Sequence, residues 1–127
     1  MAGSKSNTDY VTSSILNSVK KDLGIDSNYD AFDVDVIHAI NTAFSILTQL
    51  GAGPSDGFMI HDHKDTWESY LGESKNQELI KTYISAKVKS IFDPPANGTV
   101  MDSLQKTIAE LEWRIMMIFE HGDNKKG

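Results

Sequence analysis

The sequence predicts an all-α fold, a small bundle of about four helices. Four stretches carry apolar residues three and four positions apart, and glycine or proline interrupts the chain after each of the first three. The 127 residues are enough for one domain with its own core. We expect a flexible arm at residues 1–9, a single helical domain at residues 10–121 and a flexible tail at residues 122–127.

The first predicted helix covers residues 9–23. Val11, Ile15 and Val19 recur at four-residue steps and therefore lie on one face. Gly24 follows at the position where a glycine commonly ends a helix in a left-handed conformation. This helix is expected to pack one apolar stripe against the rest of the bundle.

The second predicted helix begins at Asp33, which is expected to cap the free amides of the first turn. Phe32 precedes it and is placed to pack onto Ile37 as a hydrophobic staple. Glycines and a proline at residues 51–54 end the helix. Its apolar residues cover a wide face, which predicts burial on two sides: Val36, Ala39, Ile40, Ala43, Phe44, Ile46, Leu47 and Leu50.

The third predicted helix starts after Ser74, with Gln77 as its capping-box partner. It ends at the corner Asp93-Pro94-Pro95, because proline lacks an amide donor and disfavours a helical conformation in the residue before it. We expect this corner to turn the chain sharply, so that the third and fourth helices pack roughly antiparallel.

The fourth predicted helix covers residues 99–121. Its apolar stripe is formed by Val100, Leu104, Ile108, Leu111, Ile115 and Ile118. The first part of this stripe is expected to bury against the third helix, at Ile84, Val88 and Ile91. Glu110 and Arg114 are placed one turn apart, where they form a favourable ion pair.

The last turns of the fourth helix carry more apolar side chains than one core-facing stripe requires. A bundle of this size covers only one side of a terminal helix. The surplus therefore predicts a subunit interface, in which methionines supply adaptable packing. The candidate interface residues here are Trp113, Met116, Met117 and Phe119.

A long connection, residues 52–73, separates the second and third helices, with a short β-hairpin as an alternative to a loop. Its tripeptide Phe58, Met59 and Ile60 is expected to stay outside the core and to order against a neighbouring subunit. These three residues are therefore candidate interface residues as well.

Histidines and aspartates follow the tripeptide in the same connection: His61, Asp62, His63 and Asp65. Imidazole and carboxylate groups suit zinc, so a metal site is one reading of this cluster. A polar, solvated loop tip is the other reading, and we favour it because no ligand converges from a second segment. We predict no bound metal.

Catalytic patterns are absent from the sequence, and we predict that the chain is not an enzyme. No serine lies in a nucleophile elbow, and no glycine-rich phosphate loop occurs. Cysteine is absent, which removes thiolate nucleophiles and thiolate metal sites. We therefore predict no catalytic residues and no cofactor. A metal-dependent enzyme that uses residues 61–65 is the alternative from this class.

The charge balance argues against tight binding of nucleic acid. The net charge is −6, and Arg114 is the only arginine. Tight binding to a duplex requires clustered basic residues that neutralise phosphates. No stretch of about 18 apolar residues occurs, so no membrane-spanning helix is expected either.

The run Lys81-Thr82-Tyr83-Ile84-Ser85-Ala86-Lys87-Val88-Lys89-Ser90-Ile91-Phe92-Asp93-Pro94-Pro95, followed by Leu111-Glu112-Trp113-Arg114, resembles a known family. It is similar to the head–tail connector, or head-completion, proteins of long-tailed bacteriophages, particularly those of Gram-positive hosts. The likeness covers roughly residues 10–120, with matching element order. Asp93, Pro94 and Pro95 correspond to a structural corner in this family.

The resemblance implies a virion structural protein at the head–tail interface, made in the cytoplasm of the host bacterium. Such an adaptor docks on the portal protein and forms a ring, dodecameric in the virion, although the free subunit can be a monomer. The ring extends the DNA channel towards the tail and meets the downstream tail-completion, or stopper, protein. Double-stranded DNA passes through without tight binding.

The acidic composition suits such a channel, because a lumen that repels phosphates leaves DNA free to slide. The carboxylates expected to face the channel are Asp33, Asp35, Asp62, Asp65, Glu68, Glu73 and Glu78, whereas a lumen lined by Lys81, Lys87 and Lys89 would contradict this expectation. A small helical protein-binding or regulatory module that dimerises through its C-terminal helix is the alternative function.

Overall fold

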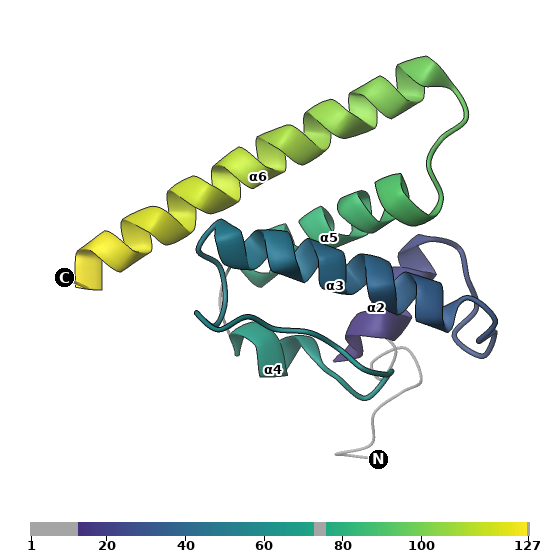
Figure 1. The fold of residues 1–127 in the computed structure, drawn as a ribbon, viewed down its shortest axis with the longest axis horizontal. Coiled ribbons are helices and arrows are strands. Elements are labelled where there is room, and N and C mark those ends of the chain that lie inside the picture. Colours follow the sequence, from purple (N-terminus) through teal and green to yellow (C-terminus); the bar gives the residue numbers. More distant parts are fainter. Residues whose placement is uncertain (1–12, 73–75, 127) are drawn as a thin grey trace, which may run out of the picture.

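The computed structural model describes residues 13–72 and 76–126. Within these residues five helices follow one another: α2 (Ile15–Asp22), α3 (Asp33–Gln49), α4 (Trp67–Leu71), α5 (Gln77–Phe92) and α6 (Gly98–Lys126) (Figure 1). The described residues contain no strand, which confirms the predicted all-α bundle.

The alternative of a β-hairpin between α3 and α5 is wrong for the described residues. That connection instead carries the short helix α4, whose first amides are capped by the Thr66 side chain. The extended pairing that the described residues do make is a single bridge between Ser14 and Thr66. Most apolar residues of the connection pack into the core as individual side chains, and Met59 stays exposed.

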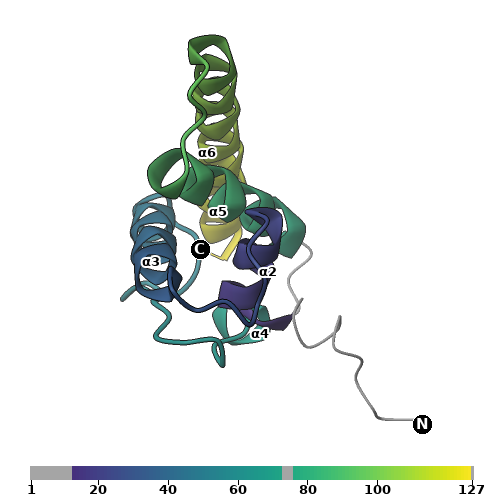
Figure 2. The ribbon, with the colours of Figure 1, turned by 90° about the vertical axis from the view of Figure 1, so that its right-hand side faces the viewer.

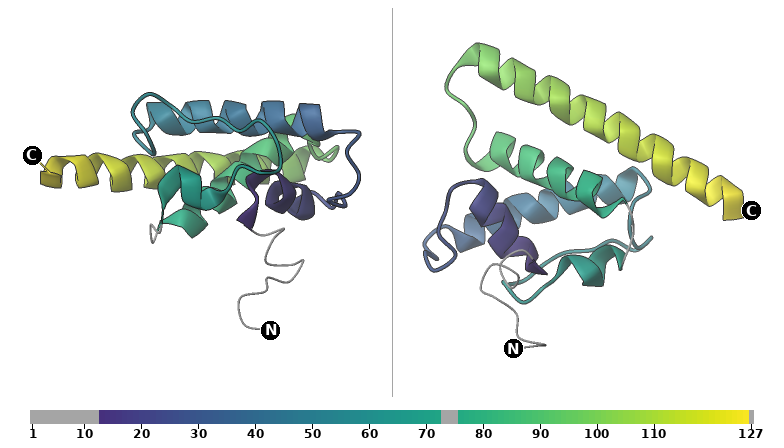
Figure 3. Two further views of the ribbon diagram at one scale, coloured as in Figure 1. Left: turned by 90° about the horizontal axis from the view of Figure 1, so that it is seen from below. Right: turned by 180° about the vertical axis from the view of Figure 1, so that it is seen from behind.

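Helix α5 is the centre of the bundle. It packs against α3 on one side and against α6 on the other, and α2 contacts both α3 and α5 (Figures 1 and 2). Seen from behind, α6 lies along one edge of the molecule, with no other described element on its outer side (Figure 3).

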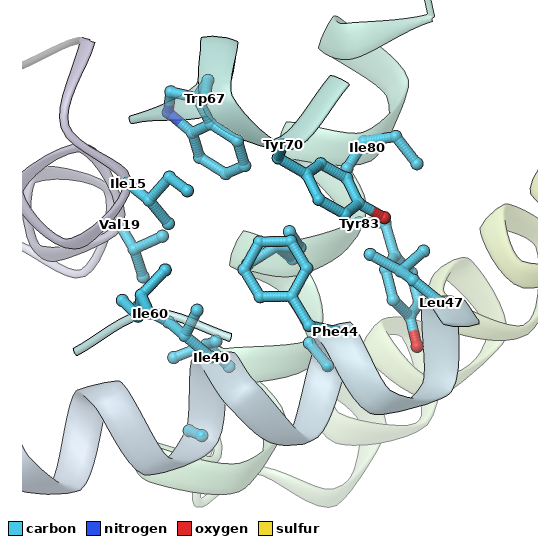
Figure 4. Close-up of a cluster of buried hydrophobic side chains, with 14 of the residues drawn as sticks. Ile15, Val19, Ile40, Phe44, Leu47, Ile60, Trp67, Tyr70, Ile80 and Tyr83 are labelled. Carbon is cyan, nitrogen blue, oxygen red and sulfur yellow. The ribbon is translucent and has the colours of Figure 1, made fainter. Parts of the chain in front are cut away.

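The main core lies where α2, α3 and α5 meet (Figure 4). Its largest fully buried apolar side chains come from α2, α3, the α3–α5 connection, α5 and α6: Ile15, Leu16, Val19, Ile40, Phe44, Leu47, Ile60, Ile80, Tyr83, Ile84 and Ile115. The apolar stripes predicted for the first three helices are therefore the faces that build this core.

A buried lysine ties the α2–α3 connection to the core. The Lys20 side chain is 1% exposed, and its Nζ lies 2.7 Å from Oδ1 of Asp33. The same Nζ donates to the backbone carbonyls of Ser27, at 3.2 Å, and Tyr29, at 2.8 Å.

The prediction that Asp33 caps α3 is wrong, because Asp33 is the first helical residue and no side chain caps that end.

Two other predicted helix starts fall on residues that the structure does not describe. α2 begins at Ile15, capped by the Ser14 hydroxyl, which accepts from the Asn17 amide at 3.2 Å. The residues predicted to begin this helix, 9–12, lie outside the described part of the chain, as does Ser74. The Gln77 side chain donates to the Gly72 carbonyl at 2.9 Å, so it holds the α4–α5 turn.

The corner at Asp93 does reverse the chain, and α5 and α6 run roughly antiparallel (Figure 1). The two helices diverge towards the corner, however, because the connection at residues 93–97 separates the end of α5 from the start of α6. The predicted burial of Ile91 against Val100 is therefore wrong: these side chains are 44% and 52% exposed.

Helix α6 is held to the bundle near its middle. Ile108 and Ile115 are 3% and 0% exposed, and Leu104, Leu111 and Phe119 pack against the same core. The Tyr83 hydroxyl of α5 donates to Oε2 of Glu112 at 2.7 Å, which adds a polar link to this seam. Glu110 and Arg114 form the predicted ion pair, at 2.8 Å, on the exposed side.

The middle seam of α6 should dominate its attachment. Replacing Ile115 by alanine should lower the free energy of unfolding by about 2–5 kcal/mol, because a fully buried side chain leaves a cavity. The matched change Ile118→Ala, one turn further at a side chain that is 37% exposed, should cost about 1 kcal/mol or less. Equal losses in chemical denaturation would contradict this placement of the seam.

The Lys20 contacts should also be measurable. Lys20→Met keeps most of the side-chain volume but leaves Asp33 and two carbonyls without their cation, so unfolding should become easier by about 3 kcal/mol. The exposed neighbour Lys21 provides the control, and Lys21→Met should change stability by less than about 0.5 kcal/mol. A Lys20→Met protein as stable as the control would show that the buried charge contributes nothing.

Candidate functional site

Two residues of the Phe58–Ile60 tripeptide, Phe58 and Ile60, pack into the folded core, so the expectation that the tripeptide stays outside is wrong for these two. Ile60 is 1% exposed, and its amide and carbonyl both bond to the Asn41 side chain, at 2.7 and 3.0 Å. This side chain satisfies the backbone of an extended segment that has no partner strand. Sequence spacing could not reveal the contact, because 19 residues separate the two positions.

An aromatic cluster holds Phe58 in place. Its ring lies 4.9 Å from those of Phe44 and Tyr70, which are 4.6 Å apart (Figure 4 shows Phe44 and Tyr70). The Tyr70 hydroxyl is buried and has no hydrogen-bond partner among the described residues, and burial raises the pKa of Tyr70. Gly53 has no room for a side chain, because a Cβ there would lie 2.6 Å from the Tyr70 ring.

Met59 is the only member of the tripeptide that is largely exposed, at 56%. It borders a shallow groove of about 470 Å³ between α3 and residues 56–59, lined mostly by polar side chains such as Asn41 and Gln49. The tripeptide therefore offers a single apolar side chain to a partner, not three.

The predicted interface residues of α6 divide between two faces. Trp113 and Met116 are exposed, at 59% and 37%, on the side away from α5, and Met117 beside them is half-buried. Phe119 turns inward and packs against the core. We call the three exposed residues Ala109, Trp113 and Met116, together with the half-buried Met117, the outer α6 face.

A second apolar surface was not predicted from the sequence. The Tyr29 ring lies 5.6 Å from that of Phe32, which lies 5.5 Å from that of Phe92 at the end of α5. Tyr29 and Phe32 are 52% and 42% exposed. We call these three residues the aromatic end patch. Phe32 was assigned to a helix staple, and nothing in the sequence showed that the α2–α3 connection would meet the end of α5.

The His61–Asp65 cluster forms a hydrogen-bonded turn. Oδ2 of Asp65 accepts from the backbone amides of His61, at 2.7 Å, and Asp62, at 3.3 Å. Oδ1 of Asp62 accepts from the Lys64 amide at 2.8 Å. Within the described residues, no three histidine, aspartate or glutamate side chains come together as metal ligands would. The two carboxylates therefore have a structural role in this turn.

Four of the basic side chains in the described part of the chain have acidic partners. Besides Lys20 with Asp33, the pairs are Lys81 with Glu78, Lys89 with Asp93, and Arg114 with Glu110. Of the carboxylates expected to face a channel, Glu73 lies outside the described residues. Asp33 is engaged by a buried cation and Asp65 by backbone amides, so these two are poorly placed to act as free surface charges.

The hydrogen bond from Tyr83 to Glu112 links α5 to α6 and does not resemble a reactive site. Burial, together with the hydrogen bond and the negative charge of Glu112, raises the pKa of Tyr83. The tyrosine therefore stays protonated and continues to donate to Glu112 across the neutral pH range.

None of the described helices has the length and apolar content needed to cross a membrane.

Comparison with known proteins assigns this arrangement to a family. The family model described as phage connector protein matches residues 15–122, which include α2 to α5 and most of α6. No curated protein and no solved structure matches the chain. The match includes the seam between α5 and α6 and the Asp93 corner, and the family is a structural one. The chain therefore belongs to the phage connector protein family and is a head–tail connector protein of a phage virion.

Proposed function

We propose that copies of this chain form a ring that docks on the portal and extends the DNA channel towards the tail-completion protein. The observation that carries this proposal is the presence of two separate apolar surfaces on one subunit, the outer α6 face and the aromatic end patch. A closed ring joins each subunit to the next through two different patches, because head-to-tail contacts are heterologous.

The position of the two surfaces suits contacts on two sides. The outer α6 face points away from α5, and the end patch lies where the α2–α3 connection meets the end of α5, at the opposite end of the bundle from the C-terminus (Figure 1). In the ring, the outer α6 face of one copy packs on the end patch of the next. The subunit is made in the cytoplasm of the host bacterium and acts in the virion.

Binding to the portal tests this directly. Purified portal from the same phage is mixed with the wild-type chain, and bound copies are counted by mass photometry and imaged by negative-stain microscopy. Trp113→Glu and Tyr29→Glu each place a charge in one surface, and each should lower ring loading by about 30-fold, the effect typical of an interface hot spot. Lys64 is exposed on a loop away from both surfaces, so the Lys64→Glu protein should load normally.

Two results would contradict the proposal. Failure of the wild-type chain to load onto the portal would remove the docking role. Normal rings from both Trp113→Glu and Tyr29→Glu proteins would show that the subunits meet elsewhere. Far-ultraviolet circular dichroism would establish that the variants fold, as expected because both side chains are more than half exposed.

The purified chain should not bind duplex DNA. Its net charge is −6, Arg114 is its only arginine, and four of its basic side chains pair with carboxylates, so the chain is poorly suited to displace counterions from phosphates. At about 0.15 M salt, where the Debye length is about 8 Å, fluorescence anisotropy with a labelled duplex should show no binding. A micromolar affinity that falls with added salt would contradict a channel that lets DNA slide and would favour a regulatory module.

A further inference from the structure

The outer side of α6 carries a second row of residues with the spacing of a helix–helix seam. Steps of three and four residues separate its members: Lys106, Ala109, Trp113, Met116 and Glu120. All five are exposed. Ala109 and Met116 each follow a core residue and lie about 100° round the helix from it, and Trp113 lies further from the core side. No other helix of the described residues covers this side (Figures 1 and 3). The row is therefore free to receive another helix.

The row is complementary to itself when a second α6 lies antiparallel with the two Trp113 residues side by side. Lys106 stands seven residues before Trp113, and Glu120 stands seven residues after it. Each lysine therefore faces the glutamate of the other copy, and the pair occurs twice. By the same symmetry Ala109, four residues before Trp113, faces Met117, four residues after it, so a small side chain meets a large one.

Other alignments lose this complementarity among the side chains that the structure describes. A parallel pair places Lys106 on Lys106 and Glu120 on Glu120, and like charges repel. If the centre of an antiparallel pair moves towards Met116, Glu120 of one copy faces Ala109 of the other. If the centre moves towards Ala109, Lys106 of one copy faces Met116 of the other. Among the described side chains, the charges therefore favour this orientation and register.

We propose that the free subunit pairs with a second copy of itself through this row, as an antiparallel, two-fold symmetric dimer centred on Trp113. The contact is a single pair of helices, so its area is small and the dimer is weak. The biological role of the dimer rests on the proposed ring: the dimer covers Trp113 in the free protein, and it must open before the outer α6 face can contact the next subunit.

Sedimentation equilibrium of the full chain, from about 10 μM to about 1 mM, tests the dimer. The wild-type protein should move from one to two copies of the 14.1 kDa chain across this range. Lys106→Glu and Glu120→Lys should each weaken association by about tenfold or more, because each puts two like-charged pairs into the dimer. The double variant Lys106→Glu/Glu120→Lys restores opposite charges and should dimerise like the wild type.

Lys64→Glu is the control for a change in net charge alone, and it should leave the dimer unchanged. Trp113→Ala should remain monomeric at every concentration while keeping its helical circular dichroism. A wild-type protein that stays monomeric, that forms ring-sized species, or whose dimer ignores the two single charge reversals overturns the proposal, as does a double variant that fails to recover. A monomer that still loads onto the portal refutes the dimer alone, whereas a dimer that never loads refutes only the proposed ring.

Discussion

The arrangement of the whole subunit depends on how α6 is attached to α5. The attachment is a short seam around Ile108 and Ile115, with a hydrogen bond from Tyr83 to Glu112 beside it. Towards the Asp93 corner the two helices diverge, and α6 begins out of reach of the core. A helix of 29 residues is thus fixed near its middle, with one long side left uncovered. This single constraint produces the surface that a neighbouring subunit can use.

The rest of the bundle holds α5, the helix to which α6 is attached, in place. α5 is buried from both sides, and the α3 side is closed by a long connection that contributes Ile60, Trp67 and Tyr70 to the core. Stability is therefore concentrated in α2, α3 and α5, while the exposed apolar residues lie at the end of the bundle and along α6. A subunit that waits in solution and later joins an assembly needs this division, because a contact surface must be accessible without the fold depending on it.

Helix periodicity was enough to predict the helical class and four of the helices, and the two prolines after Asp93 predicted the chain reversal. Periodicity failed where a contact depends on a partner distant in the sequence. Nothing near Phe58 indicates that Asn41 will bond its neighbour Ile60, and nothing near Lys20 indicates that two loop carbonyls and Asp33 will surround its ammonium group. Of the interface candidates, Trp113 and Met116 are exposed, whereas Ile60 and Phe119 pack inward, because an apolar run on a helix does not show which residue faces the core.

We propose that this chain forms the ring between portal and tail, with the outer α6 face of one copy against the aromatic end patch of the next. Electron cryo-microscopy of the neck of the intact virion tests this arrangement. We expect a closed ring of this chain beneath the portal, with Trp113 of each copy within van der Waals distance of the neighbouring copy's Tyr29 or Phe32. A neck in which Trp113 faces solvent, or in which the chain does not form a ring, would contradict it.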